Sequence, residues 1–168
     1  MTTKIKPPFR ADQVGSLLRP KALKDARAAY AAGTLSAEKL REVEDREIKA
    51  AISRQDSIGL QAVTDGEFRR SWWHYDFLWH LDGVERREFG DGIQFAGVKT
   101  RTEVPFVKSK IGFSKHPFLA HFAFVKASTT AMPKMTIPSP SMLHYRNGRK
   151  IIEAALYPDM AAYYADLG

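Results

Sequence analysis

A short, largely apolar segment that runs directly into a cluster of charged residues constrains the fold of this chain most strongly. Residues 60–64 are mostly apolar or β-branched and follow a helical pattern that ends at a glycine, which is typical of a parallel strand in an α/β sheet. Directly after them come two carboxylates, two arginines and two tryptophans within residues 65–73. Because α/β folds bind ligands at the carboxyl ends of their strands, we expect a binding site here.

The charges in this segment suit a zwitterion. A free amino acid presents an ammonium group that a carboxylate can bind and a carboxylate that an arginine fork can bind. Asp65 and Glu67, followed by Arg69 and Arg70, therefore fit an amino acid better than a simple anion. The alternative interpretation is a helix cap with a surface salt-bridge network, and the residue types alone do not separate the two.

Size and composition indicate one domain with a real core. The chain has 168 residues, of which 44% are apolar and 27% are charged, as is ordinary for a globular protein. No apolar run reaches the roughly 18 residues that a membrane span needs, so we expect no membrane partner. The first residues include charges but no apolar signal core, so a cytoplasmic location is expected.

The net charge is +7, from 26 basic and 19 acidic residues, and it raises the question of a polyanion partner. The basic residues are dispersed, with no run of five and no recognised nucleic-acid motif, so no nucleic-acid partner is expected. Cysteine is absent, which excludes a disulfide, a thiolate zinc site and a cysteine nucleophile within these residues. We expect no metal site among the histidines, because none forms a helical ligand pair; they are His74, His80, His116, His121 and His144.

Two helices are predicted before the apolar segment. The first begins at Pro20 and stops at Gly33, while Ser36 is the expected N-cap of a second helix over residues 37–57. Leu40, Val43, Ile48, Ala51 and Ile52 make its apolar stripe, and its charged residues, Glu44 and Asp45 included, are predicted to face water.

The strands alternate with these helices. Residues 9–16 are predicted as a first strand with its exit loop and residues 134–138 as another strand, with helical segments at about 71–81 and 158–167. Such alternation predicts an α/β fold with parallel pairing. The polar loops at Gly15–Ser16, residues 65–67 and residues 139–141 follow strand ends, so they are expected to converge.

Residues 83–126 have a different pattern, with short alternating segments and turn signals. Asp91–Gly92 lies between residues 86–88 and 93–95 and predicts a hairpin, and residues 104–113 and 118–126 are predicted as further strands. We interpret 83–126 as a β-rich insertion in one domain that spans residues 1–168. A complete (β/α)₈ barrel needs about 250 residues, so the expected fold is a partial barrel of the TIM type.

The ordered motifs resemble one known family. They are Val-Gly-Ser-Leu-Leu-Arg-Pro at 14–20, Leu-Ser-Ala-Glu at 35–38, Val-Glu-Asp at 43–45, Val-Thr-Asp-Gly-Glu-Phe-Arg-Arg-Ser-Trp-Trp at 63–73, and Lys-Met-Thr-Ile-Pro-Ser-Pro-Ser-Met-Leu at 134–143. Together they resemble the cobalamin-independent methionine synthase family, in particular its short single-barrel relatives. The resemblance covers nearly the whole chain but only the amino-terminal half of such a barrel.

The resemblance implies an activity and a set of substrate-binding residues. Family members transfer a methyl group from a methylated folate, the co-substrate, to the thiol of homocysteine on a zinc ion. In the resemblance, Gly15 and Ser16 match the loop that contacts the amino-acid end of homocysteine, and Glu67 matches the acidic residue that binds its ammonium. Asp65 replaces a histidine of the longer synthases and is placed in the same pocket. Arg70 matches a basic position of this loop.

The family's zinc ligands, which include two cysteines, lie in the second half of the barrel. The chain has no cysteine, so the resemblance implies that it holds no zinc, has no catalytic residue of its own and is inactive alone. The alternative is a non-catalytic half barrel that binds an amino acid such as homocysteine or methionine, or that oligomerises. Exposed sheet edges are unfavourable for a monomer, so we expect a homo-oligomer, pairing with a missing barrel half, or coverage of the edge by residues 83–126.

Overall fold

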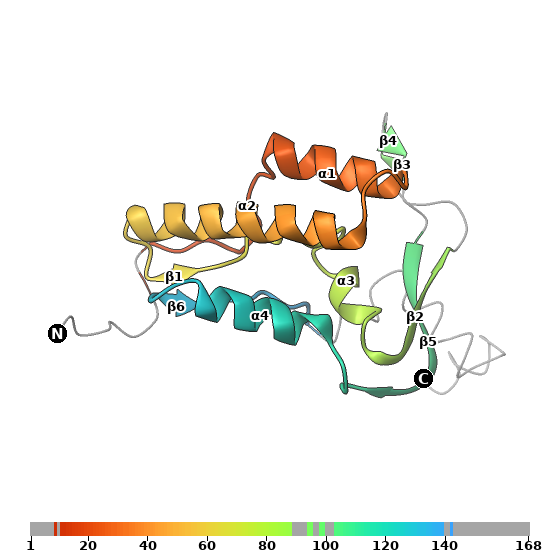
Figure 1. Cartoon of the computed structure of the whole chain (residues 1–168). Helices are drawn as coiled ribbons and strands as arrows, with labels where there is room; N and C mark the ends of the chain where they lie inside the picture. Colours follow the sequence, from red (N-terminus) through yellow and green to blue (C-terminus); the bar gives the residue numbers. More distant parts are fainter. Residues whose placement is uncertain are drawn as a thin grey trace. The chain divides into compact units, whose positions relative to one another are not determined.

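The structure is a computed structural model that describes residues 9, 11–88, 94–95, 98–99, 103–139 and 142. Its described residues form two compact units. The first contains the residues up to 71 together with 118–136, and the second contains 72–117 and the residues from 137 onward. Figure 1 labels the elements of both units.

Two helices open the first unit. Helix α1 spans Lys21–Ala31 with Pro20 at its N-cap position, and helix α2 spans Ala37–Ser57. The Ser36 hydroxyl accepts a hydrogen bond from the Lys39 amide at 3.3 Å, which satisfies one of the free donors of the first turn. The predicted bounds of α2 are therefore confirmed, and α1 begins one residue after the predicted position.

The first unit contains a parallel strand pair. Strand β1, Ala62–Val63, pairs with strand β6, Met132–Pro133, in the register Ala62↔Met132 and Val63↔Pro133. Parallel pairing is as predicted, but the second strand precedes the predicted range 134–138. The predicted first strand is wrong, because residues 11–16 and residue 9 adopt no strand in the described structure.

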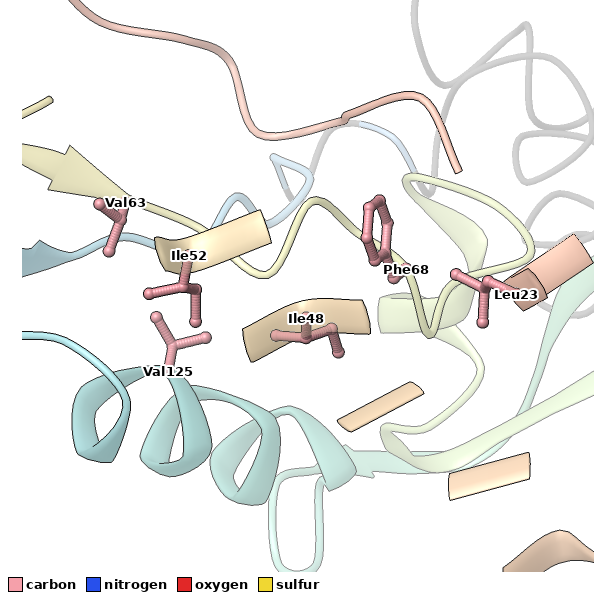
Figure 2. Packing of buried hydrophobic residues seen from close by; sticks show 6 residues of the cluster. All are labelled: Leu23, Ile48, Ile52, Val63, Phe68 and Val125. Atoms are coloured by element: carbon pink, nitrogen blue, oxygen red, sulfur yellow. The ribbon is translucent and has the colours of Figure 1, made fainter. Parts of the chain in front are cut away.

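The core of the first unit lies between the helices and this strand pair. Its buried cluster includes Ile52, Val63 and Val125, whose side chains point toward one another in Figure 2. Val125 belongs to helix α4, Pro117–Ala127, where a strand over residues 118–126 had been predicted. That prediction is wrong because α4 is apolar on all sides, so its sequence carries no helical periodicity.

The second unit contains a short helix and antiparallel strands. Helix α3 spans Tyr75–Leu78, within the predicted helical segment. Strand β2, Asp82–Glu88, pairs with β5, Glu103–Gly112, and the pair β3, Gln94–Phe95, and β4, Val98–Lys99, is also antiparallel.

The predicted pairing of residues 86–88 with 93–95 is therefore wrong, because Arg86 lies opposite Pro105. The signal Asp91–Gly92 and the predicted helix 158–167 lie outside the described residues. Within the part of the chain that the structure describes, no helix is long and apolar enough to cross a membrane.

Candidate functional site

The candidate site begins where β1 ends. The turn over residues 64–70 is closed by side chains that bond to its own backbone. The Gly66 amide donates to Thr64 Oγ1 at 3.1 Å, and the Glu67 amide donates to Asp65 Oδ1 at 2.9 Å. Asp65 is 3% exposed, so its carboxylate shapes the turn from within. Glu67 adopts a φ of 59°, a left-handed conformation that is uncommon for a residue with a side chain.

The loop at Gly15 packs against this turn. Thr64 Oγ1 donates to the Gly15 carbonyl at 2.9 Å, and the Leu17 amide donates to the Gly66 carbonyl at 3.1 Å. A Cβ atom placed on Gly15 would lie 3.5 Å from Glu67 Oε1 and 2.8 Å from Thr136 Oγ1. The predicted convergence is thus present for two of the three loops.

The convergence of the third loop, residues 139–141, stays a prediction. Ser139 belongs to the second unit, and residues 140–141 lie outside the described residues. Ser16 is exposed beside the buried Gly15, which leaves its hydroxyl accessible to solvent.

The Glu67 carboxylate is held through one of its oxygens. Oε1 accepts hydrogen bonds from Thr136 Oγ1 at 2.7 Å and from Arg70 Nη1 at 3.1 Å. Among the described residues, no hydrogen bond to Oε2 is formed. The side chain is 8% exposed, so this is a buried and oriented carboxylate with one oxygen that can still accept a hydrogen bond.

Arg70 supports this carboxylate from inside the unit. Besides Glu67, its guanidinium donates from Nη2 to the Thr136 carbonyl at 2.6 Å. Its carbon Cζ lies 4.6 Å from the centre of the Phe118 ring. At this distance the guanidinium is attracted to the face of the ring by a cation–π interaction. At 3% exposure, Arg70 compensates the charge of Glu67 and does not present a free fork to solvent.

Arg69 points to helix α2 instead. Its guanidinium donates to Asp45 and lies 3.8 Å from a Glu44 oxygen, with only 5% of its side chain exposed. The predicted exposure of Glu44 is wrong, since it is 9% exposed. Burial raises the pKa of Glu44, against the opposing effect of Arg69 and Arg27. Both arginines therefore form salt bridges, Arg69 with helix α2 and Arg70 with Glu67, and both are buried, unlike the surface network of the alternative interpretation.

The tryptophans belong to the second unit. Trp72 donates from Nε1 to Glu103 at 3.0 Å, and Trp73, 55% exposed, stacks on His74 with ring centres 4.3 Å apart. No group of three potential metal-binding side chains occurs among the described residues.

Two contributors to the site were missed from the sequence. Thr136 is hydrogen-bonded to Glu67 across 69 residues of sequence, and the available signal was that it follows β6 closely, as Glu67 follows β1. Arg19 donates to the carbonyls of Glu67 and Arg70, and no local pattern indicates this role.

Comparison with known proteins identifies relatives of this chain. No family model matches the chain. It is 48% identical over 163 residues to the Bacillus subtilis protein YxjH, covering 96% of this chain and 42% of that protein. A methionine synthase from Sulfurisphaera tokodaii is 31% identical over 128 residues, covering 76% of this chain and 37% of that protein.

A solved structure agrees with these relatives. A Listeria monocytogenes protein assigned as a vitamin B12-independent methionine synthase has 43% sequence identity and a TM-score of 0.68, over 83% of this chain and 39% of that one. The chain belongs to the cobalamin-independent methionine synthase-like proteins. This methionine synthase-like chain has an α/β fold similar to theirs. It spans 42% of the length of YxjH, 37% of the Sulfurisphaera tokodaii protein and 39% of the Listeria monocytogenes protein.

Proposed function

We propose that the chain binds the amino-acid end of homocysteine or methionine, as one part of a methionine synthase-like methyltransferase. The observation that carries this proposal is the carboxylate of the buried residue Glu67, which is fixed through Oε1 beside Gly15. Sequence relatives that include a methionine synthase support the same assignment.

In this proposal Glu67 Oε2 accepts a hydrogen bond from the substrate ammonium. A charge-assisted hydrogen bond of this kind contributes roughly 1.5–3 kcal/mol. Arg70 and Thr136 hold the carboxylate in one orientation, so little conformational freedom is lost when the ligand binds. The exposed Ser16 hydroxyl lies on the loop beside Gly15 and is the proposed donor to the substrate carboxylate.

The residues present do not fit the zinc ion that the family uses for methyl transfer. The resemblance implies that two of the ligands of this zinc are cysteine thiolates, a ligand type that zinc accepts, and the chain has no cysteine. The described residues also contain no cluster of three potential ligands. We therefore assign no step of methyl transfer to this polypeptide alone and name no catalytic residue in it; methylated folate is a co-substrate of the proposed whole enzyme.

We further propose that the α/β frame is one part of a (β/α)₈ barrel. The parallel pairing of β1 with β6 supports this, as does a site at their carboxyl ends. The absence of cysteine from the sequence favours a second candidate, a binding module without catalysis, which shares the same amino-acid site.

Calorimetric titration with L-methionine and L-homocysteine tests the proposal. Glu67→Gln keeps the shape of the side chain but removes its charge, so we expect the affinity to fall by about tenfold or more, equivalent to about 1.4 kcal/mol. The matched control is Glu42→Gln, at an exposed glutamate of α2 that pairs with Lys39, which should bind as the wild type does.

A second ligand isolates the ammonium. N-acetyl-L-methionine lacks this charge and should bind the wild type and Glu67→Gln with similar, weak affinity. The proposal is wrong if the wild type takes up neither amino acid, or if Glu67→Gln binds L-methionine as tightly as the wild type.

A further inference from the structure

The backbone at Glu67 needs support from its surroundings. Among the described residues, Glu67 is the one non-glycine with a positive φ, at 59°. A residue with a side chain remains in this conformation only where neighbouring groups over-determine it. The direction of the Glu67 carboxylate follows from this backbone conformation, so whatever holds the turn also determines where the carboxylate points.

Arg19 bonds to the middle and to the last residue of the turn over residues 64–70. Its Nη2 donates to the Glu67 carbonyl at 2.9 Å and to the Arg70 carbonyl at 2.6 Å. The amide of Arg70 in turn donates to the Glu67 carbonyl at 3.1 Å. One guanidinium group therefore fixes the carbonyl of the strained residue and the carbonyl three residues later.

Arg19 also connects the two loops of the site. It lies on the segment that begins at Gly15, and the amide of Leu17 in that segment donates to the Gly66 carbonyl at 3.1 Å. The segment that contains the exposed Ser16 hydroxyl is therefore tied to the segment that contains Glu67. A shift of the Arg19 side chain would change the position of one relative to the other.

Arg27 supplies a natural comparison. From helix α1, its Nη1 donates to the Phe68 carbonyl at 3.0 Å and its Nη2 donates to Ser71 at 2.9 Å. It has the same chemistry and bonds to the same turn, but to the carbonyl next to that of Glu67. A general effect on the stability of the turn should follow from the loss of either arginine, whereas an effect on the Glu67 conformation should follow from Arg19.

We infer that Arg19 is a positioning residue of the amino-acid site, holding the left-handed backbone of Glu67 so that its carboxylate meets the substrate ammonium. This inference rests on the proposed function for its ligand. It adds a residue that does not contact the substrate but determines how the contacting residue is presented.

The experiment compares Arg19→Met, Arg19→Lys and Arg27→Met with the wild type. Methionine keeps an apolar stem and removes the donors, and lysine keeps the charge with donors of a different geometry. For Arg19→Met we expect faster amide hydrogen exchange at residues 66–70, unchanged exchange in the middle of α2, and an affinity for L-methionine reduced by about tenfold. Arg19→Lys should lie between Arg19→Met and the wild type, and Arg27→Met should change the affinity by less than about threefold.

The outcomes separate the inference from the proposed function. Unchanged exchange at residues 66–70 in Arg19→Met, or equal losses of affinity in Arg19→Met and Arg27→Met, would overturn the inference while amino-acid binding stands. If the wild type binds no amino acid, the proposed function fails, and the exchange at Glu67 still decides whether Arg19 holds the turn more than Arg27 does. If Arg19→Met does not fold, Arg19→Lys decides by the same two measurements, and wild-type values in both overturn the inference.

Discussion

At the scale of single residues, the site depends on Gly15, whose lack of a side chain leaves room for the side chains of Thr136 and Glu67. Gly15 adopts a φ of 143°, and an added Cβ would lie 2.8 Å from Thr136 Oγ1, closer than nonbonded contact allows. The neighbouring carboxylate of Glu67 is bonded to that same hydroxyl at 2.7 Å. Backbone conformation and side-chain packing therefore both require glycine at this position.

The change Gly15→Ala should destabilise the protein and weaken amino-acid binding. Its matched control is Gly33→Ala, where φ is 73° but no atom lies within 4 Å of an added Cβ. We expect a loss of about 1–2 kcal/mol in the control, from backbone conformation alone, and a further loss of about 1–3 kcal/mol in Gly15→Ala from crowding. Urea unfolding measures both, and equal free energies of unfolding for the two variants would contradict the crowding argument.

Glu44 predicts a dependence of stability on pH. Burial raises the pKa of this carboxyl above its ordinary value of 4.5, while Arg69, Arg27 and Arg41 oppose the shift and Asp45 adds to it. Because the folded state then holds the proton more tightly, the contribution of Glu44 to stability is present below pH 4.5 and is lost as the pH rises through the raised pKa. Glu44 therefore contributes more to the stability of the folded protein at acidic pH than at neutral pH.

The comparison with Glu44→Gln isolates this effect, because other titrating groups cancel between the two proteins. The free energy of unfolding of the wild type, minus that of Glu44→Gln, should decrease as the pH is raised from about 4 towards neutrality. Urea unfolding at a series of pH values measures the difference. An increase with pH would show that the ion pairs with Arg69 and Arg27 outweigh burial.

At the scale of elements, the helices with strong end signals could be predicted from sequence. Helix α2 spans Ala37–Ser57 as predicted, because Ser36 bonds to the first turn and Gly59 adopts a φ of 80° after the last. Helix α4 could not be predicted, since its own apolar residues lie on all sides of the helix and leave no helical periodicity in the sequence. Of these Phe118 is 5% exposed and Leu119 is 58% exposed, a difference that only tertiary packing creates.

In the site too, features of the neighbouring sequence could be predicted, whereas contacts between residues far apart in the sequence could not. Glu67 could be identified because it directly follows a buried strand and lies among other charged residues. Arg69 forms an ion pair with Asp45, and Arg70 forms one with Glu67. These separate roles could not be predicted, because two adjacent arginines cannot be distinguished by residue type. Thr136 was missed because its contact with Glu67 arises from the parallel pairing of β1 with β6.

At the scale of the whole molecule, exposed apolar side chains and the short parallel sheet bear on assembly. Val14 is 84% exposed and Leu18 is 89% exposed, and both flank the Gly15 loop. Met132 in strand β6 is 42% exposed. In the described residues β1 pairs with β6 and with no other strand, and unpaired strand edges together with exposed apolar side chains favour association.

We therefore propose that the chain associates with a second copy through the surface around Val14 and Leu18, because burial of a large apolar side chain contributes about 1.5–3 kcal/mol. Sedimentation velocity over a wide range of concentration should give a weight-average coefficient that rises with concentration. The double variant Val14→Thr, Leu18→Gln should reduce this rise. Ile58→Gln, at a position 63% exposed after α2, is the control and should leave it unchanged. A wild-type protein that sediments as a monomer at every concentration would show that these side chains mediate no self-association.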